Sequence, residues 1–154
     1  MKEQVRNLYN KAQENYPTLK AQVEAQVVRW FWADGGVGLF SLEPFYFEQH
    51  RFPKSRILKE TPENTEDKYQ YGVNANDEII VERSYTEFKG QCYETFYFRE
   101  DRQIISYHFD YSKEKNVSTQ RYLSITMGYC RLFMLLLKAI NGQRRLCSMK
   151  MINL

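Results

Sequence analysis

Residues 68–111 constrain the fold of this chain most strongly, because their side chains alternate in character with the two-residue period of a β-strand. From Gln103 onward, every second position is aliphatic or aromatic: Ile105, Tyr107, Phe109 and Tyr111. Successive side chains of a strand point to opposite faces of a sheet, so this alternation predicts a strand with one buried face. Aromatic and β-branched residues, which suit a pleated surface, also fill residues 68–73, 78–88 and 91–99. We therefore expect an antiparallel meander of three or four strands.

The connections between these strands predict how their side chains line up. We expect residues 100–102 to form a three-residue loop, so that the odd-numbered residues of 93–97 and of 105–109 share one face. A two-residue loop would set polar against apolar side chains on a buried face. A two-residue turn at residues 89–90 would align Tyr85, Glu94 and His108 across three strands on the opposite face.

Length and charge indicate one domain with an uneven distribution of charge. At 154 residues the chain is long enough to bury a substantial core, and its 16% aromatic content can supply one. The net charge of +3 divides into +1 for residues 1–42, −5 for residues 43–110 and +7 for residues 111–154. Charge asymmetry of this kind suggests a charged partner or surface at one end of the molecule.

The segments before the meander are expected to cover it. Residues 2–15 place apolar side chains at helical spacing, and Pro17 suits the first turn of a second helix that continues to Trp30. Residues 39–52 read as one or two strands at an edge of the sheet, because proline interrupts them. The predicted fold class is α+β, with N-terminal helices packed on an antiparallel β-meander: helical cover in residues 1–32 and sheet in residues 38–111.

Residues 118–154 differ from the rest of the chain in being both apolar and basic. The most apolar stretch, residues 122–140, approaches the length that crosses a bilayer, but Arg131 near its middle would be costly there. We expect a C-terminal apolar helix docked on the sheet or on another subunit, within a single domain spanning residues 1–154.

The meander contains a short internal repeat. Residues 71–80 and 96–105 each run from an aromatic strand through an acidic or asparagine-containing turn into a strand that begins with Ile-Ile, at a spacing of 25 residues. This pattern resembles the tyrosine–aspartate hairpin repeats of bacterial Rhs-type proteins, and small tyrosine-rich immunity proteins encoded beside polymorphic toxins. The usual turn glycine of those repeats is replaced by Asp77 and Arg102. A plain pair of hairpins is the alternative explanation.

Few residues suggest catalysis. The best candidate is the expected row of Tyr85, Glu94 and His108 with Cys92 and Asp110 beside it, since a carboxylate can orient an imidazole as a general base. The same row is also what an ordinary cross-strand charge pair would look like. The only histidines, His50 and His108, lack the spacing of a metal site, and three cysteines without a C-x-x-C pair do not suit zinc or a disulfide framework. We expect no cofactor.

We therefore predict a non-catalytic protein-binding module, and the resemblance suggests a cytoplasmic bacterial immunity protein that occludes the active site of a toxin. An acidic patch would steer a basic partner; its expected residues are Glu82, Glu87, Glu94 and Asp110, with Tyr85 and His108 completing the binding surface. The alternatives are a nucleic-acid or membrane-surface binder that uses the basic tail, and a small hydrolase that uses His108. The net charge of −5 in the sheet region argues against a nucleic-acid partner.

Overall fold

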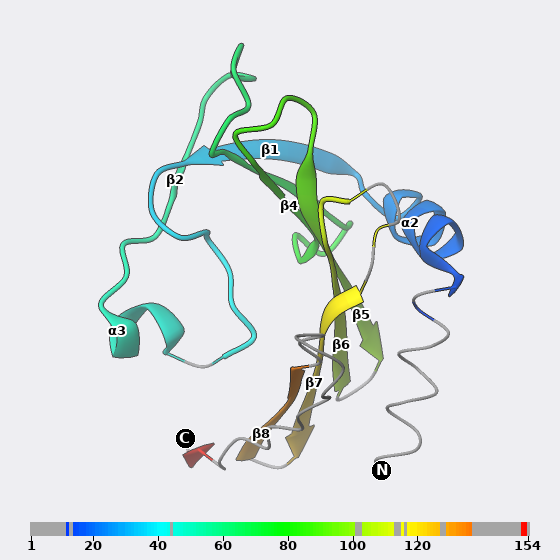
Figure 1. Cartoon of the computed structure of the whole chain (residues 1–154). Helices are drawn as coiled ribbons and strands as arrows, with labels where there is room; N and C mark the ends of the chain where they lie inside the picture. The colour runs from blue at the N-terminus through cyan, green and yellow to red at the C-terminus, as the bar shows by residue number, and fades with distance from the viewer. Residues whose placement is uncertain are drawn as a thin grey trace, which may run out of the picture.

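The structure is a computed structural model in which an antiparallel sheet forms the centre (Figure 1). It describes residues 12, 14–43, 45–100, 103–112 and 115, and the backbone of residues 117–126, 129–136 and 152–153. Within these residues, nine strands form one sheet in the order β2-β1-β3-β4-β5-β6-β7-β8-β9. The strands are β1 (Arg29–Asp34), β2 (Arg56–Ile57), β3 (Tyr69–Val73), β4 (Ile79–Tyr85), β5 (Cys92–Glu100), β6 (Gln103–Phe109), β7 (Val117–Thr126), β8 (Tyr129–Leu136) and β9 (Ile152–Asn153).

Two helices, α2 (Tyr16–Glu24) and α3 (Tyr46–His50), lie on opposite sides of this sheet (Figure 1). Pro17 occupies the first turn of α2, as predicted, and the helix ends at Glu24, with Ala25 as its C-cap. Trp30 does not continue it, because residues 29–34 form β1 and pair with β3. Residues 39–43 and 45–52 form loop and α3 where strands were predicted. The first predicted helix, residues 2–15, lies almost entirely outside the described residues.

The side that α2 covers, here called the helix face, holds the larger core cluster. Its buried members are Ala12, Val23, Ile80, Val81, Phe96, Tyr107 and Phe109. A smaller cluster of Leu42, Tyr97 and Ile104 lies on the opposite side, here called the loop face. The mixed α+β character and the four strands predicted within residues 68–111 are confirmed, as β3 to β6.

The predicted strand register is wrong by one residue at the β5–β6 connection. Glu100 pairs with Gln103 and Tyr97 pairs with Ser106, so the connection has two residues and not three. Tyr93, Thr95 and Tyr97 therefore share a face with Ser106 and His108. Sequence analysis excluded a two-residue loop because it would place a polar side chain on a buried face. The protein tolerates this arrangement because the buried polar side chain, Glu94, has ionic partners.

The predicted C-terminal helix is not confirmed over the part of it that is described. The backbone is extended in β7 and β8, and β7 pairs with β6 along seven residue pairs. An unpaired edge strand leaves a row of N–H and C=O groups without partners, and β7 supplies them for β6. Residues 137–151 lie outside the described part of the chain.

Candidate functional site

A loop that connects β1 to β2 lies over the loop face and builds one wall of the candidate site. This covering loop consists of residues 35–43 and 45–55 and includes α3. Its two ends are tied together, because Gly38 N donates to Ser55 Oγ at 3.0 Å and Ser55 N donates to Gly38 O at 2.9 Å. Leu39 N donates to the Tyr71 hydroxyl at 2.9 Å, which holds the loop against β3. The loop is thereby closed on itself and fixed to the sheet.

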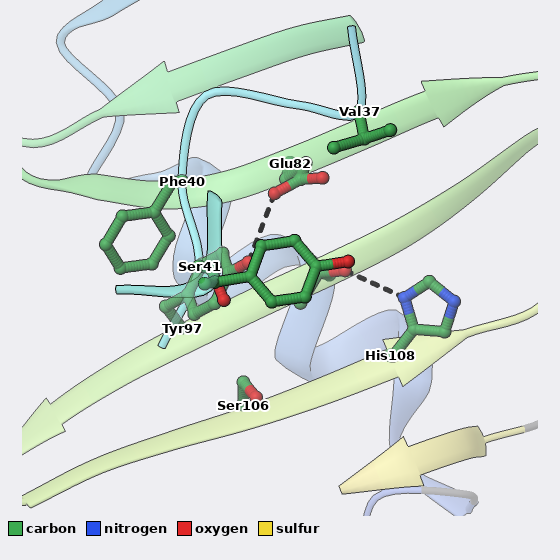
Figure 2. A pocket seen from close by; sticks show the side chains of 9 residues that line it. Val37, Phe40, Ser41, Glu82, Tyr97, Ser106 and His108 are labelled. Carbon is green, nitrogen blue, oxygen red and sulfur yellow. Dashed lines mark hydrogen bonds between the residues drawn. The ribbon is translucent and has the colours of Figure 1, made fainter. Parts of the chain in front are cut away.

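Between the covering loop and the sheet lies a cavity of about 240 Å³ (Figure 2). The strands contribute Glu82, Thr95, Tyr97, Ser106 and His108. The covering loop contributes Val37, Phe40, Ser41 and Tyr46. Polar groups thus line the sheet side, and aromatic and small side chains line the loop side.

Two hydrogen bonds across neighbouring strands order the sheet side of this cavity (Figure 2). The Tyr97 hydroxyl donates to Glu82 Oε2 at 3.1 Å. Thr95 Oγ1 and His108 Nδ1 are hydrogen-bonded at 2.9 Å. Because Glu82 pairs with Thr95 and Thr95 pairs with His108, these residues form one row across β4, β5 and β6.

A strip of aromatic rings leads away from the cavity along the loop face. The Tyr93 ring stacks on His108 with centroids 5.5 Å apart, and Tyr111 meets Tyr93 edge-on at 5.1 Å. Phe88 lies 6.3 Å from Tyr111. This aromatic strip ends in two well-exposed rings, because Phe88 is 52% exposed and Tyr111 is 40% exposed.

The predicted row of Tyr85, Glu94 and His108 does not form. Tyr85 pairs with Cys92, Glu94 with Phe109, and His108 with Thr95, so Glu94 and His108 point to opposite faces. Cys92 lies on the helix face with Glu94, away from His108. Burial raises the pKa of the Cys92 thiol, and the charge on Glu94 raises it further, which is the reverse of an activated cysteine.

The predicted acidic patch is likewise divided between the two faces. Glu82 lines the cavity on the loop face, and Glu94 is buried on the helix face. Glu87 is exposed in the β4–β5 connection, and Asp110 follows β6 and accepts a hydrogen bond from Ser112 N at 3.0 Å. The cavity therefore brings together two of the six predicted residues, Glu82 and His108.

Glu94 is the centre of a buried ionic cluster beneath α2. Its carboxylate lies 3.0 Å from Lys20 Nζ, 3.1 Å from Arg83 Nε and 3.4 Å from Lys115 Nζ. Tyr16 also donates a hydrogen bond to it. Burial acts to raise the pKa of Glu94, but the bonds from Tyr16 and Lys20 and the nearby positive charges outweigh it and lower the pKa to about 2. The cluster fastens α2 to β4, β5 and the segment after β6, and has a structural role.

Thr95, Tyr97 and Ser106 were missed by sequence analysis because the assumed register placed their strands one residue out of step. If a two-residue connection is assumed, the odd-numbered residues of 93–97 and the even-numbered residues of β6 share one face. That register places Thr95, Tyr97 and Ser106 on the same face as His108. Tyr46 carried no signal, because only the tertiary position of the covering loop brings it to the cavity.

Other kinds of site find no support in the part of the chain that the structure describes. There, no group of three or more His, Cys, Asp or Glu side chains could hold a metal ion. No helix among the described residues has the length and apolar character needed to cross a membrane. The basic side chains of the C-terminal tail lie outside those described.

Comparison with known proteins gives no match: no protein-family model, no curated protein and no solved structure is similar to this chain.

Proposed function

We propose that this protein is a protein-binding module that uses the loop face of its sheet, and that it acts as an immunity protein by covering the active site of a toxin. The observation that carries the proposal is the aromatic strip beside the cavity. Phe88 and Tyr111 leave large parts of their rings in solvent, where contact with a partner would bury them. Aromatic side chains are enriched among the residues that dominate binding energy at protein interfaces.

The charge around the strip favours a basic partner. Glu87 precedes Phe88 and Asp110 precedes Tyr111 in the chain, and Glu82 lines the cavity at the other end of the strip. Residues 43–110 carry a net charge of −5. Carboxylates around an aromatic centre speed association with a positively charged surface and fix its orientation. A toxin that cleaves nucleic acid has such a surface, and occluding it would neutralise the toxin.

Replacing Phe88 and Tyr111 together with alanine is expected to weaken the complex with the toxin by about thirtyfold to several hundredfold, because each truncated anchor residue costs roughly 1–2 kcal/mol and the two together cost roughly 2–4 kcal/mol. The partner in this measurement is the product of the reading frame encoded beside this one, purified with a disabled active site. Its affinity is measured by calorimetry. In cells, the same double substitution should reduce protection against the active toxin.

Ile57→Ala is the matched control for this experiment. Ile57 is 62% exposed but lies on edge strand β2, which β1, β3 and β4 separate from β5 in the sheet. Its truncation should leave affinity unchanged. Equal affinities for the wild type and the Phe88/Tyr111 double variant would contradict the proposed binding surface.

A hydrolase is the second candidate, and the position of His108 favours it. The hydrogen bond to Thr95 and the stacked Tyr93 ring fix the imidazole at a cavity that also contains the hydroxyls of Ser41 and Ser106. An imidazole held near a hydroxyl can serve as a general base. Hydrolysis of activated esters by the wild type, abolished in His108→Gln, would support this candidate. Equal turnover by both proteins would reject it.

A further inference from the structure

We propose that the β4–β5 connection, residues 86–91, is a preformed element that inserts the Phe88 ring into an apolar pocket on the protein partner, and that Thr86 positions this ring. The inference rests on the proposed function and specifies which feature of the partner receives the end of the aromatic strip. It comes from three properties: the hydrogen bonds within the connection, its exposure, and the different surroundings of Phe88 and Tyr111.

The β4–β5 connection is held in one conformation by its own hydrogen bonds. Thr86 N donates to Gln91 O at 3.0 Å, and Gln91 N donates to Phe88 O at 3.0 Å. The Thr86 hydroxyl adds two bonds, because it accepts from Phe88 N at 3.2 Å and donates to Gln91 O at 3.2 Å. Gly90, with a φ of +78°, supplies the left-handed position that returns the chain to β5. The backbone of Phe88 is therefore fixed before a partner arrives.

The Phe88 ring belongs to a run of exposed residues. Residues 87–91 are all exposed, and Phe88, at 52%, is the large apolar side chain among them. A partner can surround a ring on an exposed turn from several sides, and only a concave surface does so. Aromatic residues that fill a pocket on the partner typically dominate the binding energy. Because the connection is already ordered, little conformational entropy is lost when the ring enters such a pocket.

Tyr111 differs from Phe88 in its surroundings. Its ring meets Tyr93 edge-on at 5.1 Å and also lies 6.3 Å from the Phe88 ring, so two neighbouring rings of the strip contact it. It is 40% exposed, against 52% for Phe88. A partner can lie against the exposed part of the Tyr111 ring but cannot enclose it. The geometry therefore assigns the pocket to Phe88 and a flat contact to Tyr111.

Replacing each ring with the larger indole distinguishes a pocket from a flat contact. Phe88→Trp should weaken binding of the toxin with a disabled active site by about tenfold or more, because a filled pocket has no room for additional atoms. Tyr111→Trp is the matched control and should change the affinity by less than about threefold, because a flat contact accommodates a larger ring. Calorimetry measures both. Wild-type affinity in Phe88→Trp, or similar losses in the two variants, would overturn the inference.

Thr86→Val removes the hydroxyl and keeps the shape of the side chain. It should weaken toxin binding by about fivefold, because order lost from the connection must be restored on binding. Thr86→Ser keeps the hydroxyl and should bind like the wild type. Thr65→Val, in the connection between β2 and β3, is a second control and should leave the affinity unchanged.

A Phe88→Ala background shows whether Thr86 acts through the ring. There, Thr86→Val should cause no further loss of affinity, because the ring that Thr86 positions is gone. Equal losses in both backgrounds, or full affinity in Thr86→Val, would overturn the role of Thr86. Hydrogen exchange of the Phe88 amide tests the same role without the toxin: Thr86→Val should raise the exchange rate by about fivefold. An unchanged rate would show that the hydroxyl does not hold the connection.

The outcomes separate this inference from the proposed function. If the Phe88/Tyr111 double alanine variant binds the toxin like the wild type, the proposed binding surface fails and the pocket fails with it. If that double variant loses affinity while Phe88→Trp binds with full affinity, the pocket inference fails and the protein-binding function stands.

Discussion

Replacing Glu94 with glutamine is expected to lower the free energy of unfolding by about 3 kcal/mol, because removing the buried carboxylate of an ionic cluster leaves its cations poorly compensated. Among the described residues, Lys20 and Arg83 then keep only the half-buried Glu24 as an ionic partner. Glu94 is 1% exposed and has three cationic partners, Lys20, Arg83 and Lys115. Glutamine has nearly the same shape, so the loss reports charge and not packing. Unfolding in urea, followed by circular dichroism at neutral pH, measures it.

Asp77→Asn provides the control for an ion pair of similar length at the surface. Asp77 lies 2.8 Å from Arg29, but the two side chains are 82% and 58% exposed. Pairs of this kind contribute about 0–1 kcal/mol. Similar losses in the Asp77 and Glu94 variants would contradict the importance given to burial.

The pH dependence of stability checks the same cluster independently. The pKa of Glu94 is about 2 in the folded protein against an ordinary value of 4.5. In this interval the unfolded chain binds the proton more readily, so protonation favours unfolding and stability falls as the pH is lowered. Each pKa unit corresponds to about 1.4 kcal/mol, so the wild type should lose about 3 kcal/mol between about pH 4.5 and about pH 2. Glu94→Gln should lack this loss, and the stabilities of the two proteins should converge at the acidic end.

Gly36→Ala is expected to lower the free energy of unfolding by about 3 kcal/mol, because strain and overpacking each cost roughly 1–2 kcal/mol or more. Gly36 has a φ of +64°, and a Cβ there would lie 2.4 Å from Pro53 O and 2.7 Å from Ser55 N. Pro53 O also accepts a hydrogen bond from Val37 N at 3.1 Å. The methyl group would push apart the two ends of the covering loop and open the cavity. Urea unfolding measures the loss of stability.

Gly35→Ala separates the strain from the clash. Gly35 has nearly the same φ, +67°, but a methyl group added to it would meet no described atom within 4 Å. The substitution should cost only the strain of a left-handed alanine, about 1–2 kcal/mol. Equal losses of stability in the two alanine variants would show that the two ends of the covering loop do not need their close approach.

The strands of the meander could be predicted from sequence because a strand's alternation is a local property. Residues 68–73, 78–88, 91–99 and 103–111 contain β3 to β6 with small differences at their ends. Pro17 was equally informative, since a proline at the start of a helix needs no tertiary support. The apolar run from Tyr122 was not informative in this way, because a short apolar segment can be a helix or a buried strand. Its extended backbone is seen only in the tertiary structure, where it pairs with β6.

What the sequence by itself determined about this protein is therefore the existence of the central strands, which depends on neighbouring residues alone. The tertiary structure decided which face each side chain occupies. Glu94 can lie on the buried face because Lys20 approaches it from 74 positions away in the chain, together with Arg83 and Lys115. That register turns His108 toward Glu82 and the covering loop, and so creates the cavity. A change of one residue in register reverses every face, and the energy that selects the register comes from contacts distant in sequence.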